Sequence, residues 1–192
     1  MQGGAMNDDT LENRSGLPDA LRILLEKYPR DLWKNHSNFD GLTRFWLERH
    51  LMFRQVLGQL QGESQAFLNG DADPQTHASR TARMAGFLIE QLHGHHQIED
   101  HHYFPQLAAA ETRLERGFEI LDSDHHALDG HLRALADDTN AMLRAIAEGQ
   151  DARLPAGALE QRLGRFHHFI DRHLTDEEDL VVPVILHHGF RL

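Results

Sequence analysis

Cysteine is absent from the 192 residues of this chain. Its absence excludes disulfide bonds, iron–sulfur clusters held by thiolates and zinc fingers with cysteine ligands. Basic residues are also in deficit, with 19 lysines and arginines against 30 acidic residues and a formal net charge of −11. A protein that binds nucleic acid needs a basic footprint for the phosphates, so we expect no nucleic-acid partner.

Long apolar runs are missing as well. No stretch approaches the roughly 20 residues that span a bilayer, and residues 1–16 contain no apolar core of a secretory signal. We therefore expect a soluble, cytoplasmic protein with no membrane partner. The length suits one domain, or one domain with an appendage.

Residues that favour strands are scarce, with four valines and seven isoleucines against 28 leucines and 19 alanines. This composition favours helices. Loop-forming residues cluster at 69–73 and 148–153, and Asp73 before Pro74 is typical of a helix N-cap followed by a first-turn proline. We predict a short helix near residues 18–27 and four long ones at about 40–68, 74–107, 113–147 and 155–187.

Each long helix carries one apolar stripe with residues three and four positions apart, as in Phe118, Leu121, Leu128 and Leu132. Four such helices with short connections predict an all-α fold, an antiparallel four-helix up-down bundle over residues 39–192. Residues 1–38 form an N-terminal extension with the short helix. The segment 18–38 could cover one end of the bundle or form a dimer contact.

Histidine is present in excess, with 16 residues, and one histidine interrupts the apolar stripe of every long helix. In two helices a glutamate follows one turn later. The interrupting residues are His50, His95 with Glu99, His125, and His173 with Glu177. Burying four imidazoles and two carboxylates is costly unless they are paired or bind metal. Without sulfur, such a set suits iron, manganese or zinc, and two carboxylates able to bridge favour two ions.

The spacing of these residues repeats. The pattern His-x-x-x-Glu-x5-Pro occurs twice, beginning at His95 and at His173. Upstream, ERHLMFRQVLGQL around His50 aligns without gaps to SDHHALDGHLRAL around His125. The separations of the paired histidines are 45 and 48 residues. The chain is therefore a duplicated helix pair, and two half-sites face to face would make a two-metal centre with positions open to small ligands.

The segments HHQIEDHHYFPQL, from His95, and HLTDEEDLVVPVI, from His173, resemble the motifs of the hemerythrin-like (HHE cation-binding) family, with Val182 in place of phenylalanine. The resemblance covers about residues 40–187. It implies a four-helix bundle with a carboxylate-bridged, non-haem centre of two iron ions that meets dioxygen or related small molecules; manganese or zinc would also suit the ligands. It carries six positions over as metal ligands, with both glutamates as bridges: His50, His95, Glu99, His125, His173 and Glu177.

Two departures from the oxygen-carrying hemerythrins argue against a five-histidine oxygen carrier. Those proteins have His-x-x-x-His on the third helix, where this chain has Asp129 at the second position. They have His-x4-Asp on the fourth helix, where this chain has Glu177 at plus four and Glu178 at plus five. The chain is more similar to the broad group linked to iron, redox or nitrogen-oxide responses. It lacks the cysteine-bearing segment of the branch that repairs iron–sulfur clusters.

Several polar neighbours have open roles. The stripe favours His125 over His126 as the ligand. His96 is not expected to bind metal, and a role as an additional ligand is left open as the less favoured alternative. His102 is expected to be a capped core histidine, with a role as ligand or ligand-orienting residue left open, and Asp129 is expected to orient an imidazole. The remaining histidines, His77 among them, are expected at the surface. Seven of them are expected to point sideways or outwards: His93, His101, His131, His167, His168, His187 and His188.

Three functions fit this pattern. The first is a di-iron protein that binds, senses or scavenges dioxygen, peroxide or nitric oxide. The second is an enzyme on the same centre that decomposes peroxide or acts as an oxidase. The third is a structural bundle in which the metal only staples the helices. The sequence has no further acid–base pair that would indicate a large organic substrate.

Overall fold

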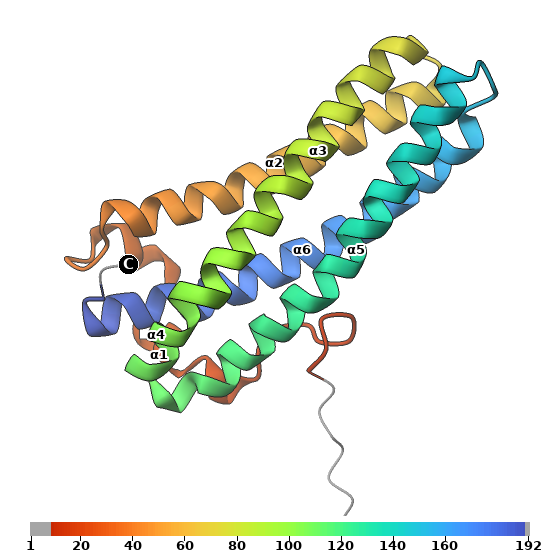
Figure 1. The fold of residues 1–192 in the computed structure, drawn as a ribbon. Helices are drawn as coiled ribbons and strands as arrows, with labels where there is room; N and C mark the ends of the chain where they lie inside the picture. Colours follow the sequence, from red (N-terminus) through yellow and green to blue (C-terminus); the bar gives the residue numbers. More distant parts are fainter. Residues whose placement is uncertain (1–8, 191–192) are drawn as a thin grey trace, which may run out of the picture.

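The computed structural model describes residues 9–190, and within this range every regular element is a helix, as predicted. The four long helices are α2 (Gly41–Asn69), α3 (Pro74–Ile98), α5 (Glu115–Ala147) and α6 (Arg153–His188). Successive long helices run in opposite directions (Figure 1). Both α2 and α5 contact α3 and α6, so the four helices enclose one common interior. The predicted ends of these helices agree with the structure to within a few residues.

Six shorter elements complete the chain: η1 (Asp19–Leu21), α1 (Ile23–Lys27), η2 (Arg30–Asn35), η3 (Glu99–Tyr103), α4 (Phe104–Ala110) and η4 (Thr112–Leu114). The element η3 is a π-helical turn that joins α3 directly to α4. The helix predicted at 74–107 is therefore one helical stretch with a π-turn inside it. No helix among residues 9–190 is long and apolar enough to cross a membrane. Residues 1–8, part of the segment searched for a signal core, lie outside the described residues.

The ends of the long helices follow the predicted capping pattern. The Asp73 carboxylate accepts a hydrogen bond from the Thr76 backbone N–H at 2.9 Å, and Pro74 occupies the first turn of α3. Asp40 caps α2 in the same way. Helix α2 ends at Gly70, whose φ of 86° lies in the left-handed region that glycine adopts without strain. These caps fix the short turn between α2 and α3.

The interior is divided into two apolar clusters. The larger cluster includes Phe53, Leu92, Leu128 and Ile170, and extends towards the turns that join α2 to α3 and α5 to α6. The smaller cluster lies at the opposite end, where Trp46, Phe104, Leu121 and Leu180 meet. On each long helix the predicted ligand histidine lies between residues of the two clusters. A polar layer thus crosses the middle of the bundle.

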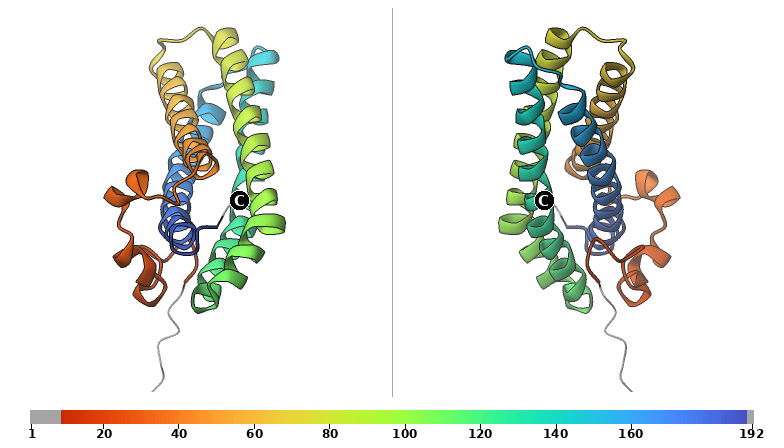
Figure 2. Two further views of the ribbon diagram at one scale, coloured as in Figure 1. Left: turned by 90° about the vertical axis from the view of Figure 1, so that its left-hand side faces the viewer. Right: turned by 90° about the vertical axis from the view of Figure 1, so that its right-hand side faces the viewer.

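The N-terminal segment packs against α6, beside the smaller cluster (Figure 2). Leu17, Leu24 and Trp33 are buried there with residues of the C-terminal half of α6. The Trp33 indole N–H donates to the backbone carbonyl of Tyr28 at 2.8 Å, so its one polar atom is satisfied. The segment thus covers part of one end of the bundle, one of the two roles considered for it, and the dimer contact stays a prediction.

Glu111 connects the corner before α5 with the end of α6. Its carboxylate is buried and accepts hydrogen bonds from Arg113 at 2.7 and 2.8 Å and from His188 at 3.1 Å. These bonds, those of Arg113 first, lower the pKa of Glu111 to about 2 against the opposing effect of burial. Glu111 is therefore charged in the folded protein at neutral pH.

Replacing Leu163 by alanine should lower the free energy of unfolding by about 2–5 kcal/mol, because Leu163 is fully buried in the larger cluster and a cavity would remain. Leu154 lies on the same helix and is 86% exposed, so Leu154→Ala should change stability by less than about 0.5 kcal/mol. Chemical denaturation of the metal-free protein measures both values. Similar losses for the two variants would contradict this location of the core.

Glu111→Gln should destabilise the protein at neutral pH but much less in acid. The pKa of Glu111 is lowered from 4.5 to about 2 on folding, so its charged interactions stabilise the fold above pH 4.5. This contribution disappears as the pH falls from 4.5 towards 2. Denaturation midpoints of wild type and variant should therefore differ most at about pH 7, differ less at about pH 3, and converge only as the pH approaches 2. The exposed Glu115→Gln serves as control, and a pH-independent difference for Glu111→Gln would contradict the assignment.

Candidate metal centre

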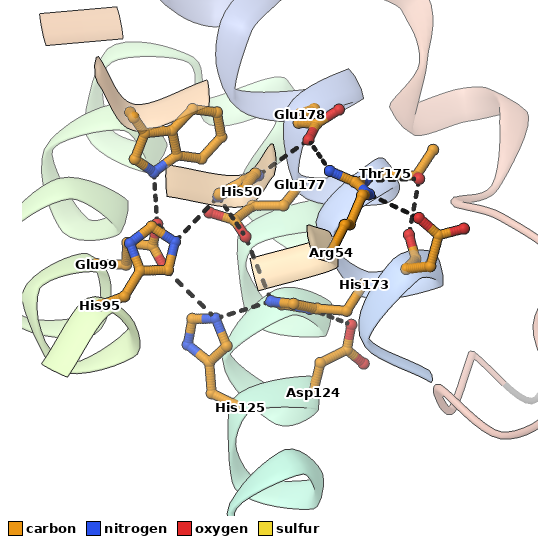
Figure 3. A network of polar contacts seen from close by, with 12 residues as sticks. His50, Arg54, His95, Glu99, Asp124, His125, His173, Thr175, Glu177 and Glu178 are labelled. Atoms are coloured by element: carbon orange, nitrogen blue, oxygen red, sulfur yellow. Dashed lines mark hydrogen bonds and ion pairs between the residues drawn. The ribbon is translucent and has the colours of Figure 1, made fainter. Parts of the chain in front are cut away.

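The six predicted ligands converge in the polar layer of the bundle (Figure 3). They come from all four long helices and from the π-turn, and each is at most 8% exposed. They are His50 on α2, His95 on α3, Glu99 on η3, His125 on α5, and His173 and Glu177 on α6. The duplicated spacing of the sequence therefore corresponds to one buried cluster in space.

The four imidazoles face one another in pairs. The Nε2 atoms of His50 and His95 are 3.0 Å apart, and those of His125 and His173 are 3.1 Å apart. The first pair joins α2 to α3, and the second joins α5 to α6. Each pair thus belongs to one of the two repeats.

Carboxylates behind the histidines fix the orientation of three of the rings. Each of these carboxylates lies within hydrogen-bonding distance of an Nδ1 atom, on the side of the ring away from the centre. The pairs are His50 with Glu178 (3.1 Å), His125 with Asp100 (2.5 Å) and His173 with Asp124 (3.1 Å). A carboxylate accepts the Nδ1 proton, so the neutral ring presents its Nε2 lone pair to the centre. Histidines that bind metal commonly have such partners.

The Nε2 atoms of His125 and His173 face each other at 3.1 Å, an approach that a shared proton or a cation bound to both nitrogens would stabilise. Burial lowers the pKa of His50 to about 4 and also lowers that of His173, so both rings are neutral and available as ligands at neutral pH.

The two glutamates lie between the imidazole pairs. Glu99 is 3.0 Å from Nε2 of His95 through Oε1 and 3.7 Å from Nε2 of His125 through Oε2. Glu177 Oε2 is 3.3 Å from Nε2 of His173 and 3.8 Å from Nε2 of His50. Each carboxylate thus reaches both pairs, as a bridging ligand would have to.

Several buried oxygens of these glutamates have no hydrogen-bond partner among the described residues: Oε2 of Glu99 and both oxygens of Glu177. Burial, and next the charge of Glu99, raise the pKa of Glu177 well above its ordinary value. For Glu99, burial alone would raise the pKa, but His95 outweighs it and the pKa lies well below the usual range. Unpartnered buried oxygens are costly, and a bound cation would satisfy them. The residues therefore fit a metal centre.

Three arginines neutralise two of the three carboxylates behind the histidines, Asp124 and Glu178. Arg14 contacts both oxygens of Asp124 and donates to Asp176 at 2.9 Å. Glu178 accepts from Arg54 at 2.8 Å and from Arg30 at 2.7 Å. Arg14 and Arg30 belong to the N-terminal segment, so the segment that covers the bundle end also contributes charge to the centre.

The π-turn positions Glu99 and rotates the residues that follow it. Buried positions on this face step from Glu99 to Phe104, five residues apart, instead of three or four. The Trp46 indole N–H donates to Glu99 Oε1 at 2.6 Å. Because of the extra residue in the turn, His102 is exposed, and the prediction that it is a capped core histidine is wrong.

Other predictions about the neighbouring residues also need correction. Asp129 is half-exposed and lies 3.5 Å from the exposed His93, so it does not orient an imidazole of the centre. Asp100, Asp124 and Glu178 have that position instead. His126 is exposed, in agreement with the choice of His125.

Two further histidines are buried against expectation. His77, expected at the surface, is fully buried and stacks on Phe67 with 4.4 Å between the ring centroids. His96 is 3% exposed and stacks on His125. His96, His125 and His173 form a group able to hold a cation, as do His50 and His95 with both glutamates. Little in the sequence distinguishes His96 from the surface histidines beside it.

Replacing Arg14 by glutamine should lower the free energy of unfolding by about 3 kcal/mol, because Asp124 would remain buried without its cation. Arg116 forms only exposed ion pairs, and Arg116→Gln should therefore cost less than about 0.5 kcal/mol. Denaturation of the metal-free protein compares the two variants. Equal small losses would mean that Arg14 is dispensable.

Comparison with known proteins supports the assignment from geometry. The family model of the hemerythrin HHE cation binding domain matches residues 41–185, which include all six predicted ligands and exclude the N-terminal segment. Comparison with curated proteins and with solved structures gave no significant match. The family match spans most of the chain and coincides with buried histidine and glutamate groups able to hold metal. The chain therefore belongs to the hemerythrin HHE cation-binding domain family.

Proposed function

We propose that the centre binds two iron ions and that the protein uses them to bind, sense or scavenge dioxygen, peroxide or nitric oxide. The observation that carries this proposal is the pairwise approach of four imidazole Nε2 atoms around two glutamates, three of whose oxygens have no hydrogen-bond partner among residues 9–190. Nitrogen and carboxylate ligands without sulfur suit iron, with manganese or zinc as the alternatives. A pair of bound iron ions supplies redox chemistry and open coordination positions for small ligands.

In this proposal each half of the antiparallel bundle supplies one ion with two imidazoles. His50 and His95 bind the first ion, and His125 and His173 bind the second. Glu99 and Glu177 bridge the two, since each reaches both pairs. The carboxylates behind the rings keep the Nδ1 protons in place and the Nε2 atoms directed inwards.

A cavity beside the centre suits a small neutral ligand. It has a volume of about 440 Å³, lies between α2 and α3, and includes His95 and Trp46 in its wall. The lining is mostly apolar, with Leu42, Phe45 and Ile98, and it also includes Arg49, Glu90 and Gln91. Dioxygen, nitric oxide or peroxide fits such a lining.

Turnover of peroxide on the same centre is the second candidate. A separate groove of about 340 Å³ between α3 and α5 reaches His125, and its wall includes Asp100, His101 and Asp122. These groups can exchange protons with solvent, as decomposition of peroxide requires. Consumption of peroxide by the iron-loaded protein separates an enzyme from a binding protein.

The wild-type protein, purified without nickel resin and loaded anaerobically with iron(II), should contain about two ions per chain. Its absorption spectrum should change on addition of dioxygen, peroxide or nitric oxide. His95→Ala should lose iron because it removes one of the two imidazoles that bind the first ion. Elemental analysis and absorption spectroscopy measure these effects.

His101→Ala is the matched control, because His101 is exposed and lies one and a half turns from His95 on the same helical stretch. It should bind iron as the wild type does. Less than about one ion per chain in the wild type, with His95→Ala unchanged, would contradict the metal centre. Two bound ions without any spectral response to the small ligands would instead favour a metal that only staples the helices.

A further inference from the structure

His96 is a buried histidine without a polar partner. It is 3% exposed, and neither ring nitrogen has a hydrogen-bond partner among the described residues. A buried imidazole carries one N–H donor and one acceptor, and leaving both unsatisfied is costly. A role in packing alone does not account for a polar ring at this position.

The other unexpected buried histidine shows what a structural role looks like in this fold. The Nε2 atom of His77 is 3.2 Å from the sulfur of Met142, and its Nδ1 atom is 3.5 Å from the hydroxyl of Thr81. Its ring also stacks on Phe67. Both nitrogens of His77 thus lie close to a polar atom, whereas neither nitrogen of His96 has a hydrogen-bond partner among residues 9–190.

The surroundings of His96 are those of the second imidazole pair. Its ring stacks on His125 with centroids 4.0 Å apart and an interplanar angle of 11°, and it meets His173 edge-on at 5.5 Å. One ligand atom from each of these three histidines lies within 4.8 Å of the other two. Three imidazoles of one buried group can therefore approach a single cation.

The helix α3 lies between α2 and α5, so consecutive residues on it can face different halves of the centre. His95 contacts the rings of Trp46 and Phe53 and faces the α2 side. His96 is rotated by about 100° and faces α5. In the second repeat the position that follows the ligand histidine is Leu174, which is fully buried. The two repeats therefore differ in chemistry at one equivalent, buried position.

We propose that His96 is a third histidine ligand of the metal ion held by His125 and His173. This inference rests on the proposed metal centre. It gives the two halves unequal ligand sets, with two histidines on the α2/α3 side and three on the α5 side. The third imidazole comes from α3, whereas oxygen-carrying hemerythrins have a second histidine on the third helix, where this chain has Asp129.

The groove between α3 and α5 gives a divalent cation a polar route to this half of the centre. His96 and His125 lie in its wall together with Asp100, and the exposed His126 lies at its outer part. Imidazole and carboxylate groups along such a groove can replace the water around an entering cation step by step. His96 is in position to bind the ion where the groove ends.

His96→Leu tests the proposal, because it places the leucine of the second repeat at the equivalent buried position. Anaerobic titration of the metal-free protein with cobalt(II), followed by absorption spectroscopy, gives the number of ions and both dissociation constants. The ion at His50 and His95 should bind as in the wild type. The ion at His125 and His173 should bind at least about tenfold more weakly, with a changed d–d spectrum. Thermal unfolding of metal-free His96→Leu should occur at or above the wild-type temperature, since an unsatisfied imidazole has been removed.

Two control variants separate a ligand from a packing residue. His168→Gln, at an exposed position of α6 outside the groove, should leave both dissociation constants unchanged. His77→Leu should lower the unfolding temperature without altering metal binding. His96→Phe provides a second variant that retains the ring stack on His125 and should also weaken the second ion.

The outcomes distinguish this inference from the proposed function. Two ions bound by His96→Leu with both affinities within about threefold of the wild type would overturn the role of His96 and leave the metal centre intact. Metal-free forms of both His96 variants that fail to fold would also overturn it, because His96 would then be a packing residue. A wild-type protein that binds no cobalt would instead contradict the proposed centre itself.

Discussion

The fold depends on one electrostatic requirement, the neutralisation of a polar layer between two apolar clusters. Imidazole and carboxylate groups cross the middle of the bundle, with Phe53 and Leu128 on one side and Trp46 and Leu121 on the other. In such surroundings an unpaired charge is costly, so each polar group must have a partner or bind a cation. The arrangement of the chain around this layer follows from that requirement.

From the centre outwards, carboxylates follow the imidazoles and arginines follow most of the carboxylates, so opposite charges lie next to each other. At the centre itself are the imidazoles and two glutamates. His173, Asp124 and Arg14 form one such series, and His50, Glu178 and Arg54 form another. A chain with net charge −11 thus places several of its cations beside buried acids. The same series keeps the Nε2 atoms directed at the centre, so stability and metal binding depend on the same contacts.

The sequence was sufficient to predict the helices and the six residues that meet at the centre, because both follow from local periodicity and from the repeat. An apolar stripe identifies the inward face of each helix whatever its neighbours are. The carboxylates behind the histidines were not predictable in this way. Asp124 and Glu178 lie off the stripes, and their partners are 49 and 128 residues away in the chain. Their role depends on the rotation of one helix against another, which sequence spacing does not specify.

The π-turn explains one of the remaining differences. A regular helix would place His102 on the inner face, and the extra residue of the turn moves it outwards. A sequence signal existed, because the inward-facing stripe steps by five positions from Glu99 to the next large apolar residue on that face, Phe104. His96 had no comparable signal, since it stands among five histidines between positions 93 and 102 and only the packing of α3 against α5 distinguishes it.

The contacts of Arg14 also constrain the order in which the molecule is assembled. Its partners Asp124 and Asp176 lie 110 and 162 residues further along the chain. During synthesis from the N-terminus, Arg14 is made first, and its two partners follow separately, Asp124 with α5 and Asp176 with α6. His173 and Glu177 emerge with α6 as well. The residues that complete the metal centre and the second ion pair of Arg14 therefore become available together, with the same helix.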